Sequence, residues 1–147
     1  MLKHTSMYLL LALSLGGAAL ANDVVNERLP KQGNQAGEAA FLANCAACHQ
    51  PTGTGLPGAF PPLAGSDFLK NNDKTKVLAS ILQGITGKLT VNGVEYNNVM
   101  PAMSHIADAD IAHIVSYVYA SWGNSGPSVS AEDVAAARKA LAVSTDP

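Results

Sequence analysis

The feature that most constrains this chain is the sequence Cys45-Ala-Ala-Cys48-His49, which brings two thiols and an imidazole within five residues. The chain of 147 residues contains no further cysteine, so both of its thiols belong to this one segment. A disulfide across so short a loop would restrain the unfolded chain little and explains the pair poorly. The segment instead indicates a site that uses both sulfurs and the adjacent histidine.

Three kinds of site could use this segment: a haem attachment site, a zinc site or a dithiol redox pair. On a helical turn the two thiols face one way and can add to the two vinyl groups of haem, and His49 then reaches the iron. Zinc would need two further ligands, and the downstream histidines, His105 and His113, lack the usual paired spacing. A redox pair of the thioredoxin type would need a βαβ setting, which the residue pattern lacks. We therefore predict one haem c, bound covalently through Cys45 and Cys48.

The sixth iron ligand decides whether such a haem carries electrons or binds small molecules. A methionine thioether is a soft, uncharged ligand that raises the reduction potential. Met100 precedes Pro101, which biases its backbone toward an extended conformation and would let a loop hold the sulfur. Met103 is the alternative, although a lone methionine more often fills a core. The residues alone leave both methionines as candidates opposite His49.

The amino terminus has the layout of a secretory signal peptide. Lys3 precedes an apolar stretch over residues 8–15, and the small-residue sequence Ala19-Leu20-Ala21 follows. The 14 positions from Tyr8 to Ala21 fall short of the roughly 20 that a transmembrane helix needs. We predict a signal peptide over residues 1–21, cleaved after Ala21, in preference to an uncleaved anchor. The mature protein would then be periplasmic, with no membrane attachment.

Length and charge bound what the mature chain can be. Removal of 21 residues from 147 leaves 126, enough for one domain with a single core. Of the 9 basic residues Lys3 is lost, which leaves 8 against 11 acidic ones and no dense basic run. Nucleic acid is therefore not an expected partner. We divide the mature chain into an arm over 22–34, a domain over 35–124 and a carboxy-terminal extension over 125–147.

Residue patterns predict an all-α fold. An alanine-rich stretch over 35–48 favours a first helix. Residues 74–83 form a second helix, which Asn72 or Asp73 caps and Gly84 ends. The clearest helix is 108–122, where apolar residues recur at helical spacing. A last alanine-rich helix, from Ser130 to about Val143, is expected to pack weakly on the domain.

Two intervening segments are predicted to be non-helical. Residues 51–62 are rich in glycine and proline and form a loop that wraps the bound group. Residues 89–96 indicate a small hairpin, because Asn92-Gly93 supplies the positive φ angles of a tight turn. About three main helices, one hairpin and an extension helix thus surround the haem.

The chain resembles the class I c-type cytochromes, in particular small bacterial monohaem cytochromes and the haem domains associated with periplasmic dehydrogenases and copper nitrite reductases. The resemblance runs from about residue 37 to residue 124 and includes Gly37, Phe41, Pro61-Pro-Leu-Ala-Gly65, Val94 to Tyr96, Met100-Pro-Ala-Met103 and Tyr117 to Asn124. It implies that the methionine before proline, Met100, is the axial ligand. It also implies that the Pro61 carbonyl accepts a hydrogen bond from His49, and that Gly37 and Phe41 contact Tyr117.

The fold and function implied are a cytochrome c fold around one haem and a one-electron carrier rather than an enzyme. The expected partners are redox proteins: a periplasmic dehydrogenase, a reductase or a terminal oxidase. Residues 54–59 and 100–103 would form the rim around the exposed haem edge. Two alternatives remain open: a haem c subunit of a dehydrogenase or reductase complex, and a ligand-binding or catalytic haem protein. The protein would be a monomer or a subunit of a complex.

Overall fold

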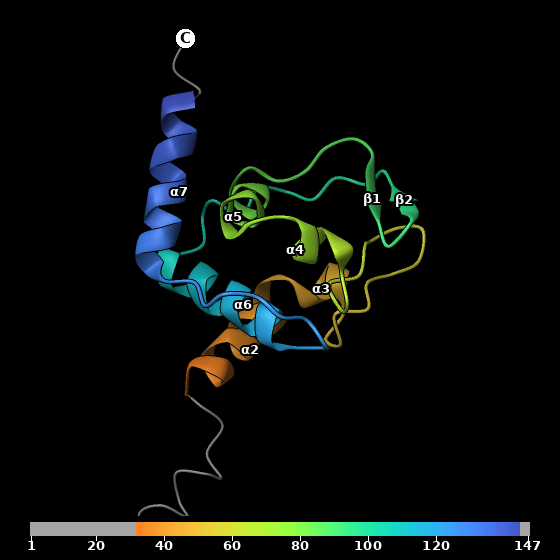
Figure 1. Cartoon of the computed structure of the whole chain (residues 1–147), viewed down its shortest axis with the longest axis horizontal. Helices are drawn as coiled ribbons and strands as arrows, with labels where there is room; N and C mark the ends of the chain where they lie inside the picture. The colour runs from red at the N-terminus through yellow and green to blue at the C-terminus, as the bar shows by residue number, and fades with distance from the viewer. Residues whose placement is uncertain (1–31, 145–147) are drawn as a thin grey trace, which may run out of the picture.

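The computed structural model describes residues 32–144, so the predicted signal peptide and most of the predicted arm lie outside the described residues. Within that range the chain forms six helices and one two-stranded sheet. In chain order these are α2 (Gln32–Asn44), α3 (Ala46–His49), α4 (Asp67–Asn71), α5 (Lys74–Gln83), β1 (Leu89–Val91), β2 (Val94–Tyr96), α6 (Asp108–Ala120) and α7 (Ala131–Ser144). Figure 1 shows α2 and α6 crossing below α5, the hairpin at one side of the molecule and α7 at the other. The prediction of a mainly helical fold with one hairpin is confirmed.

The first predicted helix is interrupted at its cysteine. The helix starts at Gln32 rather than residue 35 and ends at Asn44, and a separate turn, α3, follows Cys45. Cys45 itself has φ −121° and ψ −30°, outside the helical range, although its carbonyl still accepts hydrogen bonds from the amides of Cys48 and His49. The break lets the Cys45–His49 turn take an orientation of its own.

The α2–α6 crossing is built on a glycine and three aromatic rings. A Cβ at Gly37 would overlap the His113 carbonyl oxygen and lie 2.6 Å from the Cβ of Tyr117, so only glycine allows the helices to approach this closely. Phe41 is completely buried, and its ring centroid lies 5.7 Å from that of Tyr117 and 5.2 Å from that of Trp122. The expected contacts among Gly37, Phe41 and Tyr117 are therefore present.

The predicted second helix and hairpin are confirmed. Asp73 caps α5 by accepting a hydrogen bond from the Lys76 amide at 2.8 Å, and Gly84 ends it with φ 76°. In the hairpin Val91 pairs with Val94 across the predicted Asn92-Gly93 turn, both of whose residues have positive φ. The short helix α4 was not predicted. The helix at 108–122 ends at Ala120, two residues early, because the backbone of Ser121 is extended (φ −110°, ψ 159°).

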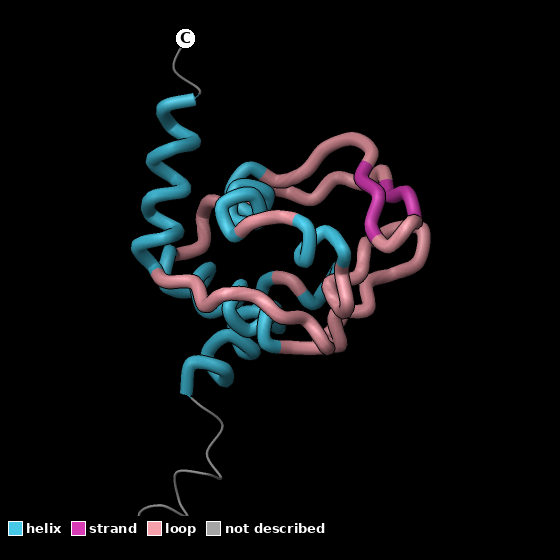
Figure 2. Tube along the Cα trace, viewed as in Figure 1, coloured by secondary structure: helices cyan, strands magenta, loops and turns pink. Residues whose placement is uncertain are grey.

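Long loops connect these helices and strands. Figure 2 shows long loop segments running from α3 to α4 and on both sides of the hairpin. The predicted loop at 51–62 has no helix or regular strand. Asn98 Nδ2 donates a hydrogen bond of 3.0 Å to the Ala59 carbonyl, which ties this loop to the segment that leads to Met100.

The last helix packs more firmly than the sequence indicated. Val134 is completely buried, Ala137 is buried, and Leu141 packs partly buried against the same core. These positions repeat at spacings of three and four, so a narrow apolar stripe faces α5 and α6. The stripe was hard to recognise in the sequence because the residues around it are mostly alanine. The expectation of weak packing was wrong. No helix within residues 32–144 is long and apolar enough to cross a bilayer.

Candidate haem site

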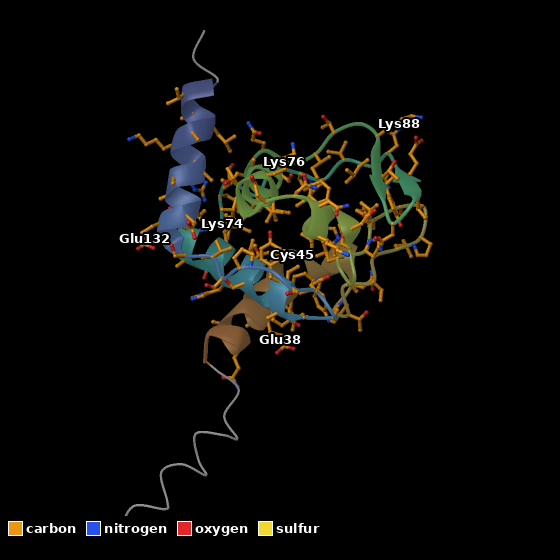
Figure 3. All side chains as sticks on the ribbon, in the orientation of Figure 1. Glu38, Cys45, Lys74, Lys76, Lys88 and Glu132 are labelled. Atoms are coloured by element: carbon orange, nitrogen blue, oxygen red, sulfur yellow. The ribbon has the colours of Figure 1, made fainter. Side chains whose placement is uncertain are left out.

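Both cysteines of the motif face one cavity. Cys45 and Cys48 line it together with His49, and both are free thiols rather than a disulfide. Figure 3 places Cys45 near the middle of the molecule. Burial and the adjacent Cys48 thiol raise the pKa of Cys45 to about 11, so this sulfur stays protonated at neutral pH. A dithiol redox site needs a lowered thiol pKa, and the environment of Cys45 has the opposite effect.

His49 is held in one tautomer by the loop that follows it. Its Nδ1 lies 3.0 Å from the Pro61 carbonyl oxygen, and a carbonyl can only accept, so Nδ1 carries the proton and donates. Nε2 then keeps its lone pair, as a metal-ligating imidazole requires. Burial lowers the pKa of His49, and the hydrogen bond to Pro61 partly opposes that shift. The hydrogen bond expected at Pro61, rather than at Pro62, is thus present.

Met100 is fixed through its backbone. Its amide donates to the Ile85 carbonyl and its carbonyl accepts from the Ile85 amide, both at 2.9 Å, in an isolated antiparallel bridge. Gly84 lies directly against this bridge: a Cβ there would overlap the Met100 carbonyl and lie 2.8 Å from the amide of Ala102. The residue that anchors Met100 is therefore Ile85, which sequence reasoning missed because a backbone bridge between distant residues leaves no side-chain signature.

Two adjoining cavities run through the centre of the domain, with empty volumes of about 890 and 720 Å³, each partly open to solvent. The two cavities share a wall, which consists of Cys45, His49, Pro61, Ile81, Ile85, Leu89, Met100 and Ile114. Apart from the motif, this wall is apolar. One thiol, one imidazole and one thioether therefore lie in the wall that the two cavities share. We refer to the two adjoining cavities together as the apolar slot.

The remaining candidate ligands lie elsewhere or play a lesser part. Met103 is half-buried, packs against the core and lines only one of the two cavities. His105 and His113 are exposed, as expected for surface histidines. Within residues 32–144 no group of three or more His, Cys, Asp or Glu side chains could hold a metal, so the zinc alternative finds no support there.

Comparison with known proteins agrees with this geometry. The sequence model of the cytochrome c family matches residues 34–122. A cytochrome c-552 of Thermus thermophilus is 37% identical over 126 residues, which cover 84% of this chain and 74% of that protein. The cytochrome c subunit of the quinone-dependent alcohol dehydrogenase of Gluconobacter oxydans is 38% identical over 106 residues, 70% of this chain and 22% of the subunit. The gluconate 2-dehydrogenase cytochrome c subunit of Pantoea cypripedii is 33% identical over 110 residues, 72% of this chain and 24% of the subunit.

An all-α fold around an apolar slot, with a Cys-x-x-Cys-His turn in its wall, defines a protein that holds a covalent haem. The chain belongs to the cytochrome c family. Its cofactor is accordingly haem c, and it is an electron-transfer protein rather than an enzyme. The two cysteines of the motif fit the attachment pattern of that family.

Proposed function

We propose that this protein is a one-electron carrier of the periplasm whose haem is attached through Cys45 and Cys48 and ligated by His49 and Met100. The observation that carries the proposal is the shared wall of the two cavities, to which His49 and Met100 both contribute. The predicted boundaries belong to the same proposal: a signal peptide over 1–21, an arm over 22–34, a domain over 35–124 and an extension over 125–147.

The two proposed ligands suit electron transfer because their backbones are held from different parts of the fold. His49 is oriented by Pro61, and Met100 by Ile85. When bound, haem supplies an iron that changes oxidation state by one electron. A pair of fixed ligands keeps the coordination the same in both oxidation states, so little rearrangement accompanies the change. The polypeptide's part is to hold the ligands, exclude water and leave one edge accessible.

An exposed apolar surface at the mouth of the cavity is suited to partner docking. Val99 is 63% exposed, and it lines the cavity together with Ala59 and Pro101. Exposed apolar side chains around a cavity are typical of interaction sites. A small surface of this kind supports brief contacts, which a carrier needs in order to turn over. The proposed partners are a dehydrogenase, a reductase or a terminal oxidase.

Replacement of Val99 by glutamate is expected to slow electron self-exchange between reduced and oxidised copies of the holoprotein. Two copies meeting at this surface would then bring like charges together, which lowers the rate by about tenfold at low ionic strength. The effect should shrink as salt is added, since screening weakens repulsion between exposed charges. The rate is measured by nuclear magnetic resonance line broadening in mixtures of the two oxidation states.

The matched control is Val143→Glu, which adds the same charge at an apolar side chain that is 71% exposed on α7 and lines neither cavity. It should leave the rate within about twofold of the unmodified protein. Equal slowing by both variants would mean that net charge, and not this surface, sets the rate. This result would contradict the assignment of the surface around Val99 as the docking surface.

A second function, as a permanent haem subunit, is suggested by the likeness to dehydrogenase cytochrome c subunits. One observation favours the free carrier. The extension helix packs its apolar stripe of Val134, Ala137 and Leu141 on its own domain, so this stripe is not available to a partner subunit. Size-exclusion chromatography of the native protein distinguishes the two, since a free carrier elutes at the mass of one chain.

The third function, a ligand-binding or catalytic haem protein, requires an open iron. With Met100 bound, the reduced protein should resist carbon monoxide at neutral pH, and its absorption spectrum should stay unchanged on exposure to the gas. Ready binding by the unmodified protein would contradict a carrier with two protein ligands and favour this third function.

A further inference from the structure

Arg138 of α7 holds the chain segment that follows Met100. Its Nε lies 2.6 Å from Asp108 Oδ1, Nη1 donates to the Ser104 carbonyl at 2.7 Å, and Nη2 donates to the Ile106 carbonyl at 2.6 Å. All three nitrogens of the guanidinium thus form hydrogen bonds within the five-residue segment 104–108. The planar, rigid arrangement of its donors makes arginine the side chain suited to such a contact.

Backbone hydrogen bonds also hold the segment between Met100 and Ile106 at two other points. The Ile106 amide donates to the Met103 carbonyl at 3.1 Å, and the Met103 amide donates to the Ile81 carbonyl at 2.9 Å. At the other end Met100 is paired with Ile85. Residues 100–106 are therefore fastened to α5 and the residues that follow it at two points, and Arg138 supplies the attachment at the far end.

The position of Arg138 is fixed by the packing of α7. Val134, one turn earlier on the same helix, is completely buried, and Lys74 Nζ of α5 pairs with Asp133 Oδ1 at 2.6 Å. Figure 3 shows Lys74 beside the start of α7, consistent with that pair. The guanidinium is consequently carried by a docked helix, so its contacts do not require further ordering of the helix backbone when they form.

We propose that Arg138 is a positioning residue for Met100: by closing the 104–108 segment it keeps the methionine sulfur on the iron. The inference rests on the proposed ligation by Met100. Without the arginine, three acceptors lose a charged donor and the segment can move away as a unit. The iron then becomes open to external ligands more often, while the helices of the domain stay folded.

The test is cyanide binding to the oxidised holoprotein carrying Arg138→Met, which removes the donors and keeps an apolar stem. Cyanide must displace the methionine sulfur, so weaker binding of the sulfur raises the apparent affinity for cyanide. The rise should be about tenfold or more, as expected for loss of hydrogen bonds to a charged group. Arg138→Lys should also raise the affinity, because an ammonium cannot span the three acceptors. The weak near-infrared sulfur-to-iron band is followed in the same samples.

Lys74→Met is the control for a purely structural role. It breaks another polar contact of α7, at the first turn of α5, where Lys74 pairs with Asp133 rather than with the 104–108 segment or Met100. It should lower the urea midpoint of unfolding while leaving cyanide affinity within about twofold. Unchanged affinity in Arg138→Met, or an equal rise in Lys74→Met, would overturn the proposal. Absence of the near-infrared band from the unmodified protein would instead show that Met100 is not the ligand.

Discussion

Replacement of Met100 by alanine is expected to open the iron and to lower the reduction potential of the haem by roughly 200 mV, a quarter of the range of about 0.8 V that axial ligands span. The thioether favours ferrous iron, and water or hydroxide in its place favours the ferric state. The near-infrared sulfur-to-iron band of the oxidised protein should disappear, and the reduced protein should bind carbon monoxide. Potentiometric titration and absorption spectroscopy measure these changes.

Met103→Ala provides the matched comparison three residues away. Met103 is half-buried against the core, and its backbone bond to Ile81 does not depend on its side chain. We expect a loss of about 1–2 kcal/mol in the free energy of unfolding, below the range for a fully buried methionine, with the band and the potential unchanged. The reverse pattern, in which Met103→Ala abolishes the band and Met100→Ala does not, would transfer the ligand role to Met103.

Much of the helical framework could be predicted because its signals are local. The α5 helix has a capping aspartate and a terminal glycine, and the hairpin has an Asn-Gly turn, so short stretches of sequence specify both. The errors arose where tertiary contacts decide. The break at Cys45 and the short α4 depend on what the surrounding chain packs against. The firm docking of α7 depends on partners in α5 and α6 that only the folded chain brings near.

The site shows the same division. The Cys45–His49 turn is specified by five consecutive residues, and the Pro61 contact was expected from the resemblance to class I c-type cytochromes. What holds Met100 could not be predicted in this way. Its bridge to Ile85 uses only backbone atoms, and Arg138 reaches the following segment from about thirty residues away. Nonlocal contacts of this kind leave no spacing in the sequence to recognise.

Replacement of both Cys45 and Cys48 by alanine should abolish covalent haem attachment. The two thiols are the only ones in the chain, so no other side chain can form a thioether to the porphyrin. Protein produced in cells with a working cytochrome assembly system should be colourless, or should release its pigment completely into acidified acetone. Loss of the haem would also leave the apolar slot unfilled, and the cooperative unfolding transition should weaken or vanish. Mass spectrometry and thermal circular dichroism measure the two effects.

Ala47→Ser is the control within the same turn, because Ala47 is an exposed spacer residue between the two cysteines. It should retain the full mass of one haem and leave the thermal transition within a few degrees of the unmodified protein. Each single cysteine variant keeps one thiol and should retain one thioether, with haem that resists acetone but is incorporated in lower yield. Acid-stable pigment in the double variant would contradict the proposed attachment, and with it the ligand geometry that depends on the turn.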